Sequence, residues 1–287
     1  MTITSIFIFL LTIWFNIRAS NPTPTGSFDW DYLIFSQRWP ITSCAQWKEA
    51  NAKNTCDLPV DKRQWIVHGI WPTKQGTEGP FFCPSAIHFD PNQLNPFLDQ
   101  LNAHWTNVEA NTKEYSFWKH EWDKHGTCAT ILPQLNSIPN FFKKGLEWNK
   151  VQNLADILTQ SKIIPGQNRY NVEQIANAVR AVTKHNPMIE CVIDSHTKES
   201  MISEIRICFD KSLEVIDCDQ SHPINNNSTN VITNCSSKKA VMYLDTIPSD
   251  GISYQMDYID NLLQSAEDHH SLLETYKFLK FLIWFSV

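Results

Sequence analysis

The segment FWKHEWDKHGTC, from Phe117 to Cys128, holds two histidines, a glutamate, an aspartate and two lysines within twelve residues. Such a group could bind a metal ion, transfer protons or form the solvated face of a helix. The zinc-protease motif H-E-x-x-H has its histidines four residues apart on one helix face. Here His120 and His125 are five residues apart, which corresponds to about 140° on an α-helix. That separation is too wide for an ordinary pair of ligands to one metal.

The same helical projection groups the polar side chains in another way. With His120 at the origin, Lys124 falls at about 40°, Glu121 at about 100° and His125 at about 140°. A cation, a carboxylate and two imidazoles on one arc indicate an acid–base surface for an anion, and the two tryptophans beside the arc are predicted to pack in the core. The alternative is a merely decorated helix, because Glu121 also has the i,i+4 and i,i+3 spacings of surface pairs with His125 and Lys124.

An acid–base mechanism usually needs a second group that faces the first across the substrate. The candidate is His68 in WIVHGIWP, near the end of an apolar stretch and followed by Gly69 and a Trp-Pro pair. We expect its side chain to project at a sheet edge beside the flat ring of Trp71. The alternative for this segment alone is a hydrogen-bonded core histidine.

The elements that must position these residues follow from hydrophobic periodicity and turn residues. Strands are expected in 28–40, 64–72 (ended by Pro72), 188–194, 203–210 and 239–245. Helices are expected in 45–55, in 92–105 with an interruption at Pro96, in 138–160, and in 171–185 with Asn171 as N-cap.

Both ends of the chain differ in character from the middle. Residues 1–20 contain an apolar run from Ile6 to Ile17 followed by small residues, which predicts a signal peptide, too short for a typical membrane span. Residues 21–245 are expected to form one domain, and residues 246–287 a mostly helical tail that packs or binds a partner. A lipid-anchor signal at the end of the tail is the alternative.

The number and spacing of the cysteines agree with the secretion that a signal peptide implies. The eight cysteines are even in number, lie beyond residue 20 and form no C-x-x-C pair, so a disulfide framework is favoured over zinc or redox chemistry. Three N-x-[ST] sequons in the same compartment are candidate glycosylation sites: Asn226, Asn227 and Asn234.

The net charge of −6 excludes a protein that holds nucleic acid through a broad basic face. Removal of residues 1–20 takes away only Arg18 and gives −7, whereas protonation of all ten histidines would bring the remaining chain to −7 + 10 = +3. An acidic compartment would therefore favour polyanion binding.

The two histidine segments, HGIWP and FWKHEWDKHGTC, resemble the two active-site segments of the ribonuclease T2 family in order and composition. Ile70 replaces the more usual leucine, and Asp123 stands where glutamate is common. The similarity in layout extends from about Phe28 to Asp245. It implies an α+β fold with a central antiparallel sheet, flanking helices and disulfides, and endoribonuclease activity on single-stranded RNA without a metal or cofactor.

The resemblance also implies roles for individual residues. His68 would be the general acid that protonates the leaving 5′-oxygen, and His125 the base that takes the 2′-hydroxyl proton. Glu121 would stabilise the pentacoordinate phosphate. The remaining implied contacts are Lys124 and His120 with phosphate oxygens, and Trp71 and Phe117 with bases.

The family pattern implies four disulfides: Cys44–Cys56, Cys83–Cys128, Cys191–Cys235 and Cys208–Cys218. It further implies a secreted or lysosomal monomer that acts on RNA and not on DNA, without a stable membrane span. Two other functions stay open from the sequence. One is a secreted protein that keeps this scaffold but acts by binding or toxicity, and the other is a metal-dependent hydrolase, which the five-residue spacing disfavours.

Overall fold

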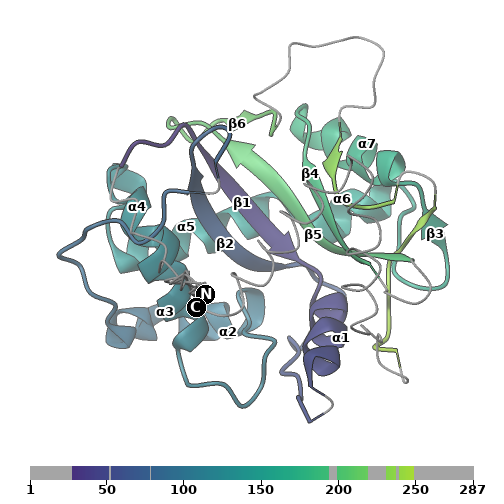
Figure 1. Cartoon of the computed structure of the whole chain (residues 1–287), viewed down its shortest axis with the longest axis horizontal. Coiled ribbons are helices and arrows are strands. Elements are labelled where there is room, and N and C mark those ends of the chain that lie inside the picture. Colours follow the sequence, from purple (N-terminus) through teal and green to yellow (C-terminus); the bar gives the residue numbers. More distant parts are fainter. Residues whose placement is uncertain are drawn as a thin grey trace, which may run out of the picture.

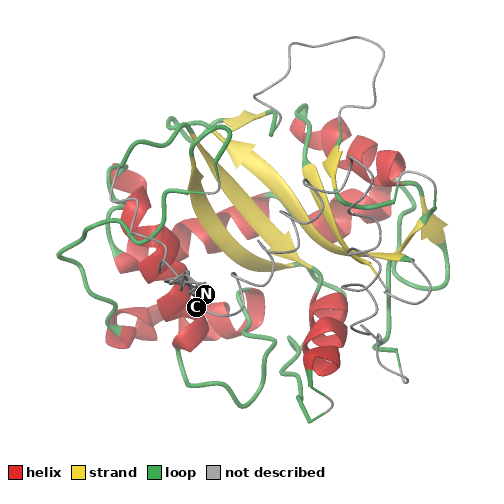
Figure 2. Ribbon diagram, viewed as in Figure 1, coloured by secondary structure: helices red, strands yellow, loops and turns green. Residues whose placement is uncertain are grey.

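The computed structural model describes residues 28–51, 53–77, 79–193, 199–218, 231–236 and 239–248. A twisted sheet crosses the middle of the molecule, and helices lie behind it and beyond one of its edges (Figures 1 and 2). The predicted signal segment, two of the sequons (Asn226 and Asn227) and residues 249–287 of the predicted tail lie outside the described residues.

The long strands form the antiparallel centre of the sheet, in the order β2-β1-β5-β4. Two short strands, β7 and β8, pair in parallel with β4 and β5, so the sheet is mixed at its margins. The predicted α+β class is confirmed. The strands of the described chain are β1 Tyr32–Arg38, β2 Ile66–Thr73, β3 Arg169–Tyr170, β4 Met188–Ile193, β5 Ser200–Phe209, β6 Val215–Ile216, β7 Ile232–Thr233 and β8 Val241–Met242.

The helices divide into groups around this sheet. The group α2–α4 lies beyond the β2 edge, α5 runs behind β1 and β2, and α6 and α7 lie toward β4 (Figure 1). The bounds are α1 Pro40–Ala50, the 3₁₀ helix η1 Pro91–Phe97, α2 Leu98–His104, α3 Ser116–Glu121, the π-helical turn η2 Trp122–Gly126, α4 Thr127–Ala129, the 3₁₀ helix η3 Pro133–Leu135, α5 Ile138–Val151, α6 Leu154–Gln160 and α7 Val172–Thr183.

Large aromatic side chains fill the core between α5 and the sheet. Trp148 of α5 stacks on Phe209 of β5 with ring centroids 3.9 Å apart, and Phe35 of β1 contacts both rings edge-on. The tryptophans of the histidine segment, Trp118 and Trp122, are buried as expected. Because both rings are buried, they anchor α3 and η2 on the rest of the molecule.

Two predicted helices have different bounds in the structure. The expected helix 138–160 is two helices, because Asn153 adopts an extended conformation and its side chain accepts a hydrogen bond from the Asp156 amide, which caps a new helix. The expected helix 45–55 begins earlier, at Pro40, where the fixed backbone angle of proline suits a first helical position. The helix capped by Asn171 is confirmed, with a full capping box to Gln174.

Two strands also differ from the prediction. The strand expected to stop at Pro72 continues through it to Thr73. β2 is an edge strand, where the missing N–H of proline need not remove a ladder hydrogen bond. The strand expected at 239–245 is only Val241–Met242, because it pairs with β3 at two positions and with β5 at one.

All eight cysteines are paired, as the family pattern implied. The bonds are Cys44–Cys56, Cys83–Cys128, Cys191–Cys235 and Cys208–Cys218. The second bond connects the loop after β2 to the short helix α4, and therefore restrains the two histidine segments relative to each other.

The stabilisation by these bonds should depend on the length of chain that each closes. Cys83–Cys128 spans 45 residues and Cys208–Cys218 spans 10. Loop-closure entropy predicts losses of about 4 and about 2.7 kcal/mol, respectively, when each pair is replaced by serine. Urea unfolding of the two double variants tests this difference, and equal losses would show that denatured-state entropy does not govern their contribution.

Candidate active site

A β-bulge positions His68. In the β1–β2 pairing Gln37 lies opposite Val67 and Ser36 opposite Gly69, so His68 is the extra residue of the longer strand. Val67 and Ile70 both lie in the core although they are three residues apart, which strict alternation would forbid. The bulge therefore keeps Val67 and Ile70 in the hydrophobic core while His68, although buried, is directed to the polar cluster of the site, as bulges beside functional sites often do. The sequence prediction had placed His68 near a strand end, whereas it lies inside β2.

The π-helical turn η2 positions the second histidine. Residues five apart lie on one face of a π-helix, unlike in an α-helix. The 140° separation predicted for His120 and His125 assumed an unbroken α-helix. His120 lies on α3 and His125 on the π-helical turn, and their ring centroids lie 6.4 Å apart. Glu121, the last residue of α3, is buried, as are Lys124 and His125 on the turn.

The two histidine segments meet at Trp71. Its ring lies 5.0 Å from the His68 ring and 5.5 Å from the His125 ring, between centroids. Its indole N–H donates a 3.0 Å hydrogen bond to Oε2 of Glu121. The other oxygen of Glu121, Oε1, lies 4.0 Å from Nε2 of His68. Trp71 thus orients the glutamate, a role that the sequence did not indicate.

This meeting requires glycine at position 69. A Cβ atom there would lie 2.1 Å from Oε2 of Glu121 and 2.3 Å from the indole nitrogen of Trp71. Both atoms belong to the hydrogen bond that orients Glu121. Because glycine has no side chain, the Trp71–Glu121 hydrogen bond can lie directly against the backbone of β2 at this position.

Burial alters the protonation of Glu121. Loss of water raises its pKa to about 8, although the Trp71 hydrogen bond, Lys124 and Arg38 each lower it. Glu121 is therefore a neutral acid at mildly acidic pH and can donate a hydrogen bond from Oε1, which has no hydrogen-bond partner among the described residues.

Burial also keeps two of the histidines neutral. It is the largest cause that lowers the pKa of His120, to about 4, and the pKa of His125 well below its usual value. The ammonium group of Lys124 lowers both further. Neither ring nitrogen of His125 has a hydrogen-bond partner in the described part of the chain.

His68 has a partner of opposite charge that the sequence analysis missed. Its Nδ1 lies 2.6 Å from Oε1 of Glu204 on β5, and Arg206 binds the other oxygen of that carboxylate. Burial lowers the pKa of His68, and Glu204 opposes this effect. A signal existed in SEIRICFD, where a glutamate and an arginine two apart share one face of an otherwise apolar strand.

At the margins of the site, two cationic side chains each lie over an aromatic ring. Arg38, also missed from the sequence, lies 4.5 Å above the Phe117 ring, and its guanidinium donates to the Thr106 carbonyl. The ammonium group of Lys124 lies 4.9 Å above Phe81. Every residue proposed from the sequence for catalysis or phosphate binding thus gathers in one region, and both proposed base-stacking aromatics border it.

A metal ion is geometrically possible here. His120, Glu121 and His125 each offer a ligand atom, and these atoms lie within 4.8 Å of one another. The spacing argument against a shared metal therefore fails, because it assumed an α-helix. The electrostatics still favour an anion, since Lys124 adds a positive charge to the same turn and Glu121 is neutral below about pH 8.

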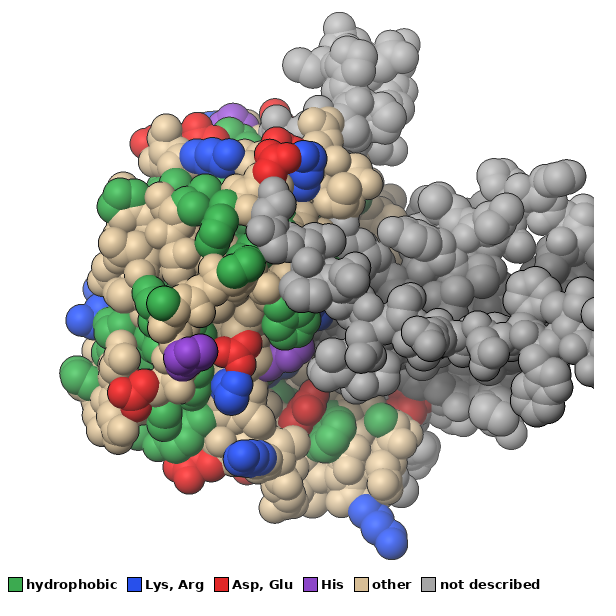
Figure 3. Space-filling model, turned by 60° about the vertical axis from the view of Figure 1, so that its left-hand side comes forward, with side chains coloured by type: hydrophobic (Ala, Val, Ile, Leu, Met, Phe, Trp, Pro, Cys, Tyr) green, Lys and Arg blue, Asp and Glu red, His purple; other side chains and the backbone are tan. Residues whose placement is uncertain are grey.

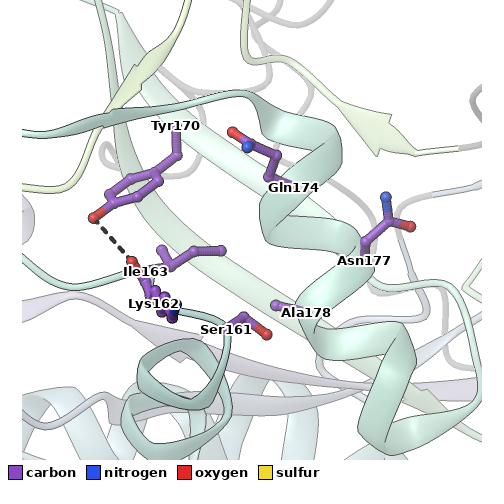
Figure 4. A pocket seen from close by; sticks show the side chains of 7 residues that line it. All are labelled: Ser161, Lys162, Ile163, Tyr170, Gln174, Asn177 and Ala178. Atoms are coloured by element: carbon purple, nitrogen blue, oxygen red, sulfur yellow. Dashed lines mark hydrogen bonds between the residues drawn. The ribbon is translucent and has the colours of Figure 1, made fainter.

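The surface around the site is not broadly basic. On the face shown in Figure 3, lysine and arginine side chains are scattered among acidic, histidine and hydrophobic ones. A separate hollow lies between the end of α6 and α7, where the Tyr170 hydroxyl donates to the Lys162 carbonyl (Figure 4). Its lining includes no histidine or carboxylate, so it offers no comparable acid–base pair.

Comparisons with known proteins agree with this geometry. The profile of the Ribonuclease T2 family matches residues 30–218. Ribonuclease Oy of Magallana gigas is 36% identical over 195 residues, which span 67% of this chain and 89% of that protein. Ribonuclease T2 of Sus scrofa is 33% identical over 193 residues, spanning 66% and 90%. The crystal structure of human RNase T2 has a TM-score of 0.59 at 28% identity and covers 75% of this chain and 98% of its own.

The matched region, residues 30–218, includes both histidine segments and the strands β1 to β6. The chain belongs to the ribonuclease T2 family. Membership supports endoribonuclease activity with RNA as substrate. No helix in the described residues is long and apolar enough to cross a membrane.

The close approach at position 69 predicts a sharp effect of Gly69→Ala. The added methyl group must displace Glu121 or Trp71, which should destabilise the protein by about 1–3 kcal/mol and reduce RNA cleavage well beyond what partial unfolding explains. Urea unfolding and single-turnover cleavage at a temperature where the variant is folded measure the two effects. A folded variant with wild-type cleavage would show that the Glu121–Trp71 contact is dispensable.

Proposed function

We propose that the protein cleaves single-stranded RNA by metal-independent transphosphorylation, giving a 2′,3′-cyclic phosphate and then a 3′-phosphate. The observation that carries this proposal is that two buried histidines in different electrostatic surroundings both lie beside Trp71. When two residues of the same type have environments that push their pKa values apart, one can act as the acid and the other as the base.

His125 is the base of the first step. The nearby cations and its burial keep the imidazole neutral, so a ring nitrogen can accept the 2′-hydroxyl proton as that oxygen attacks phosphorus.

His68 is the acid of the same step. Its contact with the Glu204 carboxylate favours the imidazolium, and the negative phosphodiester would favour it further. As the bond from phosphorus to the 5′-oxygen breaks, Nε2 gives its proton to that oxygen. In the second step the roles reverse: neutral His68 takes a proton from water, and protonated His125 returns its proton to the 2′-oxygen.

The groups between the histidines stabilise the pentacoordinate phosphate. Lys124 supplies a positive charge, and protonated Glu121 donates a hydrogen bond to a phosphate oxygen where a carboxylate would repel it. His120 holds another phosphate oxygen. A neutral Glu121 refines the role that the family resemblance implied.

Substrate choice follows from the chemistry and the aromatics. The nucleophile is a 2′-hydroxyl, so DNA is not cleaved. Trp71 and Phe117 stack bases, worth about 1–3 kcal/mol per base and tolerant of sequence. Their partly buried rings also contact Arg206 and Arg38, which supplies positive charge near the RNA.

The proposal includes the cellular setting of the protein. Four disulfides favour an oxidising compartment, in keeping with a signal peptide at 1–20 and a secreted or lysosomal monomer with a catalytic domain at 21–245. Glycosylation of Asn226, Asn227 or Asn234 belongs to this proposal. The carboxamide of Asn234 already bonds both backbone groups of Cys191, which leaves one amide hydrogen for a glycan to replace.

The chemistry predicts a matched set of outcomes. His68→Ala and His125→Ala should each lower turnover by about 10²–10⁴-fold, whereas His104→Ala, at the exposed end of α2, should not. Glu121→Gln should cost less, because the amide can still donate. Product analysis should find the 2′,3′-cyclic phosphate first, no effect of EDTA and intact DNA.

Two results would overturn this mechanism. EDTA-sensitive cleavage would return the site to the metal-dependent alternative. A folded wild-type protein that leaves RNA intact would favour the alternative of binding or toxicity without cleavage.

The pH dependence follows from the directions of the pKa shifts. His68 must be protonated and its pKa is lowered, so activity should decline as pH rises toward and beyond about 6.5. Loss of the Glu121 proton at about pH 8 should remove more. His125 stays neutral into the acidic range, which keeps activity high there. A profile of kcat/KM that still rises between about pH 7 and about pH 9 would contradict these assignments.

A further inference from the structure

Glu204 stands between His68 and the centre of the sheet. Building on the proposed function, we infer that Glu204, held by Arg206 and Ser36, is a positioning residue that fixes the His68 ring with Nδ1 toward β5 and Nε2 toward Glu121 and the phosphate. It would thereby decide which histidine is the acid.

The two oxygens of Glu204 have separate partners. Oε1 lies 2.6 Å from Nδ1 of His68. Oε2 accepts from the Ser36 hydroxyl at 3.0 Å and from Nε and Nη2 of Arg206 at 2.9 and 2.7 Å. Three donors on one oxygen fix the carboxylate on the sheet, so the imidazole must adapt to it.

A carboxylate that is ionised can only accept hydrogen bonds. Burial alone would raise the pKa of Glu204, but Arg206 and His68 together lower it below its usual value. Nδ1 of His68 must therefore carry a hydrogen in both protonation states. The proton that is exchanged during the reaction is then the one on Nε2, the nitrogen 4.0 Å from Glu121.

The other charged and titratable groups that face His68 disfavour its positive charge or are neutral, so its contact with Glu204 determines whether the imidazolium forms. Arg38 of β1 and Arg206 of β5 both disfavour its positive charge, and His120 and His125 approach from α3 and η2. Lys124 lies on the same turn as His125. Glu121 is uncharged at mildly acidic pH, so the charge that favours the His68 imidazolium there comes from Glu204.

The arrangement also connects to the other side of the site. The Arg206 guanidinium lies 5.1 Å above the Trp71 ring, and Trp71 orients Glu121. β5 therefore supports both the acid and the phosphate-stabilising residue, although it contributes no group that would touch the substrate in this mechanism.

The test is Glu204→Gln, which keeps the shape of the side chain and removes its charge. Histidine-selective NMR should show the midpoint of the His68 titration shifted toward acid by about one pH unit or more. The alkaline limb of kcat/KM for RNA cleavage should shift with it, lowering activity about tenfold on that limb. The matched control is Glu190→Gln, because Glu190 also binds Arg206, at 3.2 Å, but does not bond to His68. That control should leave the limb in place.

Wild-type protein provides a measurement that does not depend on any variant folding. Nitrogen-15 shifts should show neutral His68 with its hydrogen on Nδ1. Hydrogen on Nε2, or a Glu204→Gln variant that cleaves RNA with an unshifted limb, would overturn the positioning role. Wild-type protein that fails to cleave RNA would overturn the proposed function instead, whatever the tautomer of His68.

Discussion

The contact between the π-helical turn and bare backbone at Gly69 is the constraint on which the site depends. It allows the Trp71–Glu121 hydrogen bond to lie directly on an edge strand, which brings two distant segments of chain into one cluster. The bulge turns His68 toward that cluster, and the Cys83–Cys128 disulfide ties the loop after β2 to the helix that follows the turn. Each of these features would have little purpose without the close approach.

Removal of water then gives chemically similar groups different protonation states. Glu121 and Glu204 are both carboxyl groups with little exposure to water, yet the first is neutral at mildly acidic pH and the second is an ion. The difference arises because Glu204 forms direct hydrogen bonds with the Arg206 guanidinium and with His68. Likewise His68 contacts a carboxylate that favours its charged form, whereas burial, Lys124 and the other two histidines all lower the pKa of His125. In the proposed mechanism these different neighbours, rather than the types of the two residues, distinguish the acid from the base.

This arrangement explains how an acidic protein can act on a polyanion. The net charge is −6, and the face in Figure 3 carries no basic band. In the proposed mechanism, positive charge is supplied near the reacting phosphate by Lys124, Arg38 and Arg206, each of which is packed against an aromatic ring. Affinity for RNA would then rest on stacking and on the site itself more than on long-range attraction.

The sequence by itself determined both histidine segments and the family, because these depend on local patterns and on spacing. Through the family it also determined the α+β class and the four disulfides. It did not determine the helical geometry of FWKHEWDKHGTC, since a π-turn and an α-helix have the same local composition. Nor did it indicate Glu204, which is 136 residues from His68 and reaches it only because β1 separates β2 from β5 by one strand. Charge partners of this kind are decided by tertiary structure, because Coulomb and hydrogen-bond energies depend on distance in space and on exclusion of water.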